Sequence, residues 1–420
     1  MSNLPEGWVE TTLGEISFSK QYGYTESAST EKVGPKFLRI TDIQDDFIDW
    51  NAVPYCPISE KDKLKYQLGV GDIVIARTGN STGETATIKD DSVDAVFASY
   101  LIRFKINPQI ADYNFIDFSL RSKRWKMFVK SIKGGSAQGG ANANNFAEYP
   151  INLPPLPEQK AIADMLASFD EKIELLREQN KTLETLAQTI FKEWFVHFNF
   201  PDQHGKPYRS NGGEMVESEL GLIPKGWRVG KIKDFVNILS GFAFKSKDFV
   251  EDGRYGLVTI RNVQDGSFVK DTKDRLNTLP AKMPAYCHLR TGDILLSLTG
   301  NVGRVCHVIG KAYLLNQRVA KLQAKEKTAF GFVYLFFRQS SVLNEMENIS
   351  SGTAQQNLSP IKTAELDAII PNLGVLNEFS SIVNPMIEKI LSNEEEIQTL
   401  SKTRDTLLPK LMSGQVRVNI

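Results

Sequence analysis

The sequence has few of the residues that build disulfide-rich or zinc-binding proteins. Its 420 residues include three cysteines and four histidines. Cys56, Cys287 and Cys306 are odd in number and form no Cys-x-x-Cys pair, so neither a disulfide framework nor a zinc ribbon is expected. We expect small buried or partly buried thiols instead. The histidines form no pair with ligand spacing, and we predict no metal site.

Long apolar runs and net charge are also absent. No run reaches the roughly 18 apolar residues of a membrane span, and MSNLPEGWVE lacks the basic and apolar segments of a signal peptide. We therefore expect a cytoplasmic protein without membrane contact. Lys+Arg and Asp+Glu both number 50, and 41% of the residues are hydrophobic, as in globular proteins. A chain of this length should form at least two domains.

The sequence repeats itself with a shift of 217 to 221 positions. NLPEGW near the start matches LIPKGW at residues 222–227, and FLRITDIQD at 37–45 matches LVTIRNVQD at 257–265. GDIVIARTGN at 71–80 likewise matches GDILLSLTGN at 292–301. Because this period is far longer than the roughly 20 to 50 residues of a solenoid unit, each copy should be a domain with its own core.

Within each copy the patterns predict both strands and helices. DIVIA and DILLSL are bounded by Gly-Asp and Thr-Gly-Asn, which indicates strands that run into turns. Residues 115–132 and 332–349 are predicted to be helices. Each copy is therefore expected to be an α/β domain of about 150 residues.

A long helical segment with a heptad pattern follows each copy. Apolar residues recur at steps of three and four around residues 166–194 and 379–407, and each seam contains one asparagine. An antiparallel arrangement sets Asn180 against Asn393, and we predict that this pair fixes the register; the alternative is that each asparagine lies at a solvated edge. The predicted core residues are Ile173, Leu176, Asn180, Leu183, Ile190, Val383, Ile390, Asn393, Ile397 and Leu400.

The order of these parts resembles a known family. A variable domain, NLPPLPEQKAIADML at 152–166, a long helix, GGEMVESELGLIPKGW at 212–227, a second domain and LLPKLMSGQVRV at 407–418 are similar to the specificity subunit of type I restriction-modification systems. The resemblance covers essentially the whole chain. NLGVLNEF at 372–379 departs from it, since the PPLPEQ wording is missing there.

The resemblance implies an α+β fold. Two homologous α/β target recognition domains would be separated by two long antiparallel coiled-coil helices, with an internal pseudo-twofold repeat. The expected parts are recognition domain 1 (1–155), the first spacer helix (156–200), a linker (201–221), recognition domain 2 (222–372), the second spacer helix (373–414) and a C-terminal tail (415–420).

The resemblance also implies a function without catalysis in this chain. Each recognition domain would read one half of a bipartite double-stranded DNA target. The helices would dock methyltransferase subunits, and a motor nuclease subunit would join the complex. No cofactor is expected in this chain, whereas S-adenosylmethionine, ATP and Mg²⁺ are implied for the partner subunits.

Charge is distributed unevenly between the two copies. Residues 215–372 contain 21 Lys+Arg and 15 Asp+Glu, but residues 1–155 contain 17 and 19. Residues 121–135 nevertheless hold six Lys or Arg and no acid, with Trp125 and Phe128 between them. This stretch is interpreted as a helix that follows DNA phosphates; the alternative is a solvated helix with its aromatics in the core.

Turns that carry forked donors and amides are the expected positions for reading base edges. Thr-Gly-Asn occurs in both copies and is at least as consistent with a structural turn, so residues that differ between copies are better candidates. The predicted DNA contacts are Arg77, Thr78, Asn80, Lys133, Ser136, Gln138 and Asn144 in the first copy, and Arg261, Asn262, Thr299, Asn301, Arg304, Thr353, Gln355, Gln356 and Asn357 in the second.

Two other classes of function were weighed. NLPP at 152–155 is similar to the Asn-Pro-Pro loop of amino methyltransferases but is interrupted by Leu153, and Glu158-Gln159-Lys160 has the Glu-x-Lys spacing of nucleases without a partnering Asp. No catalytic residue is predicted, although a methyltransferase or nuclease with divergent motifs stays an alternative. A scaffold whose globular copies bind protein is the third possibility.

Overall fold

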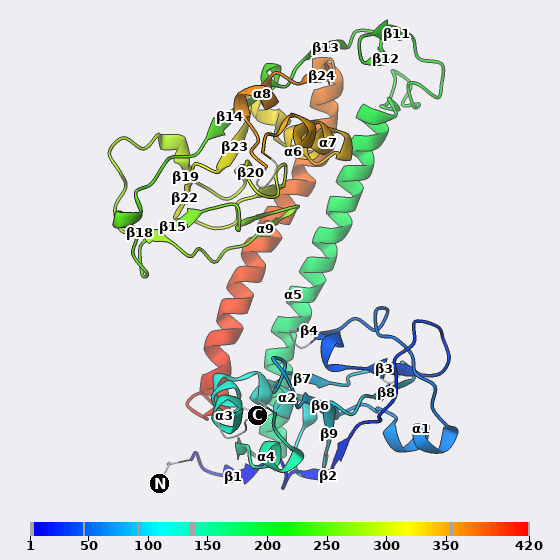
Figure 1. The fold of residues 1–420 in the computed structure, drawn as a ribbon, viewed down its shortest axis with the longest axis vertical. Helices are drawn as coiled ribbons and strands as arrows, with labels where there is room; N and C mark the ends of the chain where they lie inside the picture. The colour runs from blue at the N-terminus through cyan, green and yellow to red at the C-terminus, as the bar shows by residue number, and fades with distance from the viewer. Residues whose placement is uncertain (1–3, 45–46, 91, 134–139, 353–355, 419–420) are drawn as a thin grey trace. The chain divides into compact units, whose positions relative to one another are not determined.

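The computed structural model describes residues 4–44, 47–90, 92–133, 140–352 and 356–418 (Figure 1). It divides the chain into two units. Unit 1 comprises residues 1–172 and 400–420, and unit 2 comprises residues 173–399. The two long helices, α5 (Leu156–Phe191) and α9 (Leu373–Met412), each contribute to both units.

Unit 1 contains short strands and four short helices before α5. The strands are β1 (Val9–Thr12), β2 (Ser17–Tyr22), β3 (Lys36–Leu38), β4 (Ile43–Gln44), β5 (Phe47–Ile48), β6 (Asp72–Ala76), β7 (Thr85–Thr87), β8 (Ala95–Phe97), β9 (Leu101–Ile106) and β10 (Pro150–Leu153). The helices are α1 (Glu60–Tyr66), α2 (Tyr113–Arg121), α3 (Lys123–Lys133) and α4 (Ala143–Ala147).

Unit 2 begins with the second half of α5. Its strands are β11 (Met215–Ser218), β12 (Gly221–Pro224), β13 (Arg228–Lys231), β14 (Val236–Ser240), β15 (Tyr255–Val258), β16 (Val263–Gln264), β17 (Ser267–Phe268), β18 (Arg275–Leu276), β19 (His288–Leu289), β20 (Ile294–Ser297), β21 (Val305–His307), β22 (Tyr313–Leu315), β23 (Val319–Ala324) and β24 (Asp367–Ile370). Its short helices are α6 (Phe330–Phe337), α7 (Ser340–Ile349) and α8 (Pro360–Ala364).

The two units share the topology of one four-stranded sheet, although the second sheet of unit 2, β18-β15-β22-β19, has more strands than its β3-β8 counterpart. A four-stranded antiparallel sheet has the order β2-β9-β6-β7 in unit 1 and β14-β23-β20-β21 in unit 2. Each unit also contains one parallel pair, β3-β8 or β15-β22. The first strand of each copy pairs with its last, as β1-β10 and as β13-β24. The repeat in the sequence therefore reflects two domains of the same α+β fold.

The most similar repeated segment forms a central strand of each sheet. All five residues of β6 and all four of β20 are buried, which explains their continuous apolar pattern. Gly71 and Gly292 precede them with φ of 85° and 91°, a conformation that favours glycine. Each strand therefore delivers the Thr-Gly-Asn turn to the same end of its sheet.

The helix predicted at residues 115–132 is interrupted in the structure. α2 ends at Arg121, and Ser122 is extended, with its hydroxyl accepting a hydrogen bond from the backbone N–H of Trp125 at 3.3 Å. Serine favours this capping role over a helix interior. The helix predicted at 332–349 is interrupted in the same way, since α6 ends at Phe337 and α7 begins at Ser340.

The long helices extend the core of each unit. In unit 1, Ile162, Leu166 and Leu411 join the apolar cluster of β6 and α2, and in unit 2 Phe191 and Phe379 join the corresponding cluster. α5 has 36 residues and is followed by a π-helical turn at Lys192–Val196, so it ends before the expected residue 200. α9 has 40 residues.

Within unit 2, α5 and α9 run antiparallel and meet through the two asparagines. The Asn393 side-chain amide donates to the Asn180 amide oxygen at 2.8 Å, which is the pair that the antiparallel alignment sets together. Both asparagines are buried, so neither lies at a solvated edge. Among the other expected core residues, Ile173, Leu176, Val383 and Ile397 are buried, and Leu183, Ile190, Ile390 and Leu400 are partly buried.

The three cysteines are buried free thiols, as expected. Burial raises the pKa of Cys56 to about 11 and that of Cys306 to about 12, so both thiols are protonated at neutral pH. Over the residues that the model describes, no helix combines the length and apolar character needed to cross a membrane.

Candidate nucleic-acid interface

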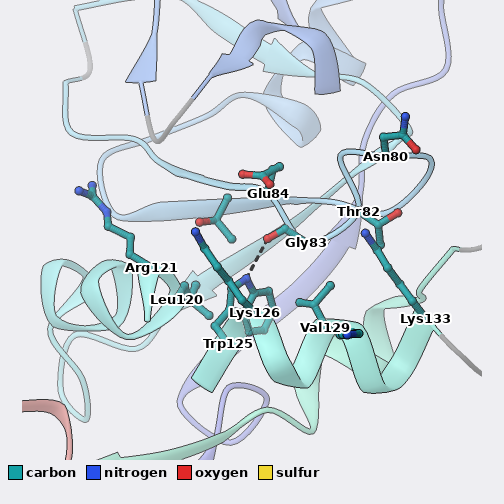
Figure 2. A pocket seen from close by; sticks show the side chains of 12 residues that line it. Asn80, Thr82, Gly83, Glu84, Leu120, Arg121, Trp125, Lys126, Val129 and Lys133 are labelled. Carbon is teal, nitrogen blue, oxygen red and sulfur yellow. Dashed lines mark hydrogen bonds between the residues drawn. The ribbon is translucent and has the colours of Figure 1, made fainter. Parts of the chain in front are cut away.

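A basic groove lies between α3 and the turn that joins β6 to β7. The cavity measures about 370 Å³, and Lys126, Lys130 and Lys133 line its α3 side. Figure 2 shows Lys126 and Lys133 extending from α3 on the side where the turn carries Thr82 and Glu84. Lysine ammonium groups along one helix face can contact successive phosphates without reading sequence. The predicted contact Lys133 is thus part of the groove.

Two close contacts hold the turn against α3. Gly83 has φ of 91°, and a Cβ added there would lie 2.5 Å from Cγ1 of Val129, so only glycine fits this approach. The indole N–H of Trp125 donates to the Gly83 carbonyl at 2.8 Å, as Figure 2 shows. The turn and the helix, which are the two walls of the groove, are therefore held in a fixed arrangement.

The aromatic residues of the basic stretch belong to the core. Trp125 is buried and packs edge-on against Tyr149, with ring centroids 4.9 Å apart, while Phe128 is partly buried beside both. The part of the alternative interpretation that places Trp125 and Phe128 in the core is therefore confirmed. The exposed lysines of α3 remain available to phosphate. The same helix therefore packs aromatic side chains into the core and presents lysines to solvent.

Arg77 and Asn144 are brought to one end of the first sheet. The Arg77 guanidinium lies over the Tyr22 ring at 5.0 Å, and the Tyr22 hydroxyl accepts from the backbone N–H of Ala143 at 3.1 Å. The backbone of Ala141 donates to the Arg77 carbonyl at 3.0 Å. Asn144 is exposed in α4 beside this contact. Tyr22 was not identified from the sequence, because a lone tyrosine in a strand gives no distinguishing signal.

The Thr-Gly-Asn turns have the same backbone form in both units. Gly79 and Gly300 have φ of 69° and 72°, so the shared glycine serves the turn itself. Asn80 and Asn301 are exposed at the two tips, while Thr78 and Thr299 are half-buried. Predicted residues Ser136, Gln138, Thr353 and Gln355 lie outside the described residues.

In unit 2 the turn meets the segment that follows the end of α7. The backbone N–H of Gly300 donates to the Gln356 carbonyl at 3.1 Å, and Thr299 forms a β-bridge with Asn357. Asn357 also exchanges two backbone hydrogen bonds with Ser351. Gln356 and Asn357 are both exposed. The structure therefore gathers the predicted contacts of these two loops at one edge.

Arg304 is held beside a residue that the sequence analysis did not select. Its guanidinium donates to the Gln264 amide oxygen, and the Gln264 amide nitrogen donates to the Arg261 carbonyl at 3.0 Å. In the amide orientation that satisfies its neighbours, Asn301 Oδ1 accepts from Nη1 of Arg304 at 3.2 Å. Gln264 belongs to the Gln-Asp pair that occurs in both copies, and this repetition is the sequence signal that could have identified it.

The assignment of Asn262 to DNA contact is contradicted by its environment. Asn262 is 2% exposed. Its amide oxygen accepts from the backbone and hydroxyl of Thr259 at 2.9 and 3.1 Å, and its amide nitrogen donates to the carbonyls of Val269 and Asp271, both at 2.8 Å. The side chain is saturated by turn contacts and is not available to a base.

The repeat alignment could have identified this structural role. Asp42 occupies the position of Asn262 in the first copy, and its carboxylate accepts from the backbone N–H of Arg39 at 2.9 Å. Asp and Asn both form this local turn with the residue three positions earlier. Their exchange between copies indicated a backbone function at this position.

The helix that corresponds to α3 carries opposite charge. α7 contains Glu345 and Glu347 and no Lys or Arg between Ser340 and Ile349. Burial and the nearby Asp367 raise the pKa of Glu345. An acidic helix repels phosphate, so α7 does not offer the phosphate-binding face that α3 offers.

Glu158 is engaged in an ion pair. Its carboxylate accepts from Nε and Nη2 of Arg417 at 2.9 and 2.7 Å and from the Trp8 indole N–H at 3.2 Å. Its carboxylate thus joins the start of α5 to the C-terminal tail and to the segment before β1. Asn152 of the NLPP segment lies in β10 and pairs with Glu10 of β1. It is therefore a strand residue and not part of a turn before α5.

The family comparison matches most of the chain. The model of the "Type I restriction modification DNA specificity domain" matches residues 5–185 and again residues 224–402. The HindI specificity subunit of Haemophilus influenzae is 24% identical, over 97% of this chain and 99% of that protein. The MjaIX specificity subunit of Methanocaldococcus jannaschii is 28% identical, over 72% of this chain and 69% of that protein.

A solved structure shares the fold. The crystal structure of the type I restriction-modification S subunit from M. genitalium aligns with a TM-score of 0.61 at 15% identity, covering 100% of this chain and 98% of that one. The family match falls on both copies of the repeat, and the fold of each copy agrees with it. The chain belongs to the type I restriction-modification DNA specificity family and contains two copies of its domain.

Proposed function

We propose that the two recognition domains, one in each unit, each read one half of a bipartite double-stranded DNA target. The observation that carries this proposal is that one backbone position, equivalent in the two domains, carries a different side chain in each. The backbone N–H of Arg77 donates to the Tyr100 carbonyl, and that of Leu298 donates to the Arg318 carbonyl, both at 3.0 Å. In the first domain Arg77 lies beside exposed Tyr100, whereas in the second Leu298 is buried and the exposed side chain beside it is Arg318, so the two domains offer bases different chemistry.

Phosphate contact in the first domain is assigned to the groove of α3. Lys126 and Lys130 are exposed and Lys133 is half-exposed, and Glu84 is the acid that lines the same cavity. Each phosphate neutralised by a lysine releases condensed counterions, which makes affinity depend on salt. The candidate base contact Asn80 lies on the turn that forms the opposite wall of the groove. The candidate base contact Arg77 directly precedes that turn.

The long helices are proposed to dock methyltransferase subunits. Leu175 and Leu186 of α5 are 59% and 44% exposed, and apolar side chains on the outer face of a helix favour contact with another protein. A motor nuclease subunit would complete the assembly. S-adenosylmethionine, ATP and Mg²⁺ would be bound by those partners.

We further propose that this chain supplies no catalytic residue. Glu158, the strongest candidate for a nuclease carboxylate, is buried and bound by Arg417 and Trp8. A carboxylate that is saturated by an arginine fork is not free to hold a catalytic metal ion.

Two experiments test the proposal. Footprinting of the complex reconstituted with its methyltransferase subunits should show two short protected patches on duplex DNA. Absence of any protection would favour a scaffold that binds protein. Incubation of the purified chain alone with DNA and labelled S-adenosylmethionine should give no methyl transfer; transfer without a partner would instead establish a methyltransferase.

A further inference from the structure

Arg338 connects the second recognition domain to α5. It caps the C-terminal end of α6, and its guanidinium forms an ion pair with Glu184 of α5. Nη1 also donates to the Tyr334 hydroxyl at 2.9 Å, and Tyr334 in turn donates to Glu184 at 3.4 Å. The side chain of Arg338 is 11% exposed and that of Glu184 is 23% exposed. The contact is therefore largely shielded from water.

The same guanidinium also holds the hairpin formed by β16 and β17. Nε and Nη2 of Arg338 donate to the two carboxylate oxygens of Asp265 at 3.2 and 3.4 Å. Gly266 lies so close that a Cβ there would be 2.8 Å from Nη2 of Arg338. The hairpin backbone consequently rests on the arginine, and a planar fork that binds two carboxylates fixes direction as well as distance.

The hairpin leads directly to the candidate base-reading residues. Gln264 precedes Asp265, and its side chain accepts from Arg304 and donates to the Arg261 carbonyl. A continuous series of hydrogen bonds thus runs from Glu184 on α5 through Arg338 and the hairpin to Arg304.

Apolar packing joins α6 to α5, with the ring centroids of Phe191 and Phe332 5.6 Å apart, so the hairpin is the part of the junction that depends on polar contacts. A cavity of about 330 Å³ lies beside it, lined by Glu184, Asp265, His307, Tyr334 and Arg338 among others. Where side chains do not interdigitate, orientation depends on directional polar contacts. Burial alone would lower the pKa of Arg338, but Tyr334 and the carboxylates of Glu184 and Asp265 outweigh burial and raise it, so the charge is retained.

The first recognition domain has an arginine at the equivalent repeat position. Arg121 lies 217 positions before Arg338 and ends α2, the counterpart of α6. Its Nη1 donates to Asp170 of α5 at 3.0 Å, and its Nη2 donates to Asp117 at 2.6 Å. In each unit, therefore, an arginine at the end of a recognition-domain helix forms an ion pair with α5. The other contacts of the two arginines differ.

We propose that Arg338 is a positioning residue that holds the reading loop of the second domain in a fixed orientation on α5, and thereby makes the complex selective for the separation of the two half-sites. This rests on the proposed function. Loss of Arg338 would leave the domain folded and packed on α5 through its apolar core, but it would free the hairpin and the reading residues beside it to shift. Duplexes with altered separation would then be accepted.

The test uses the complex reconstituted with its methyltransferase subunits. Duplexes carry the motif found by sequencing the methylated genome, with the native gap, one base pair fewer or one more. The readout is the methylation rate on the native gap divided by the rate on an altered gap. We expect Arg338→Gln to lower this ratio by about tenfold and Asp265→Asn to lower it by less. Glu174→Gln is the control, because Glu174 on α5 forms an exposed ion pair with Arg177 on the same helix.

The outcomes separate the two proposals. If the wild-type complex methylates no duplex in a sequence-dependent way, the proposed function fails. If it is selective and both variants keep its gap selectivity, the positioning role is wrong. Asp265 is 65% exposed, so Asp265→Asn decides the question even where Arg338→Gln fails to fold. A general loss of stability would lower the rate on all three duplexes equally and leave their ratio unchanged, which would also overturn the role.

Discussion

Asn393 and Asn180 form a buried hydrogen bond between two helices that are 213 residues apart in the chain, with Nδ2 of Asn393 2.8 Å from Oδ1 of Asn180. The remaining donors are also used, since Asn393 donates to Gln179 at 2.7 Å and Asn180 donates to Glu394 at 3.2 Å. A shift of one helix would leave these amides facing aliphatic side chains. The pair therefore selects one register of α5 against α9.

Replacing one asparagine should cost more than replacing both. Asn180→Leu leaves the Asn393 amide without this acceptor in a buried position, and we expect the unfolding free energy to fall by about 1–2 kcal/mol. Asn180→Leu/Asn393→Leu should recover most of that loss, because an apolar pair leaves no unpaired amide. Urea denaturation measures both, with Thr185→Leu at an exposed position of α5 as the control. A double variant less stable than the single one would contradict this.

The register itself can be measured by crosslinking. Cysteines at positions 180 and 393 should form a disulfide on oxidation, while the native thiols stay buried. Crosslinking in another register, with none between 180 and 393, would show that the asparagine pair does not set the alignment.

The C-terminal tail should stabilise unit 1 through Arg417. Glu158 has a side chain that is 1% exposed, and Arg417→Gln would leave its carboxylate with the Trp8 indole as the remaining donor identified here. Because the Glu158 carboxylate is buried, we expect the unfolding free energy to fall, although solvent screens the half-exposed Arg417 and limits the loss. Trp8 fluorescence during denaturation reports this change.

A double-mutant cycle separates the ion pair from other effects of the tail. Glu158→Gln/Arg417→Gln should lose less unfolding free energy than the sum of the two single changes. Lys410→Gln, at an exposed position near the end of α9, should change little. Additive losses would show that Arg417 acts on unit 1 without Glu158.

The lysines of α3 should control salt dependence and not sequence preference. Each of Lys126→Gln, Lys130→Gln and Lys133→Gln should reduce the slope of log affinity against log salt by about 1 and weaken binding to all duplexes alike. Titrations of the complex at several salt concentrations measure the slope. Lys61→Gln in α1 is the matched control. A changed methylated motif in the α3 variants would instead assign these lysines to base reading.

His307 should make unit 2 less stable in mild acid. Burial lowers its pKa to about 4, with Nδ1 hydrogen-bonded to the Gly292 carbonyl at 3.1 Å. The unfolded chain gains a proton near pH 6.5 while the folded one does not, so the stabilisation present above pH 6.5 is lost as the pH falls toward 4. Between pH 7 and pH 5 the expected loss is about 2 kcal/mol.

His307→Phe isolates this contribution. Other titrating groups are common to both proteins, so the variant should show a smaller fall in unfolding free energy between pH 7 and pH 5. Equal falls in the two proteins would mean that His307 is protonated in the folded state at pH 5.

The sequence predicted the features that depend on local periodicity and on the repeat. The heptad spacing placed Asn180 and Asn393 in a common seam, and the matched GDIVIA and GDILLSL segments predicted equivalent strands. Both follow from patterns that short-range geometry imposes on the chain. The split between α2 and α3 was missed because Ser122 interrupts an otherwise continuous helical pattern with a capping hydroxyl.

Contacts over long sequence distances were beyond prediction from one sequence. Arg417 and Glu158 are 259 residues apart, and neither shows a pattern that pairs it with the other. Arg318 likewise differs from its surroundings only in where the fold places it. Asn262 shows the opposite error, because a polar residue in a turn was assigned to DNA although the turn itself uses all of its hydrogen-bonding groups.

The central claim is that each recognition domain reads its own half of the target. Residues 1–155 can be exchanged for those of a relative with a different motif, and the methylated genome of cells that carry the exchanged complex can be sequenced. The account predicts that one half of the modified motif changes while the other half and the gap stay the same. A motif that changes in both halves, or in neither, would contradict it.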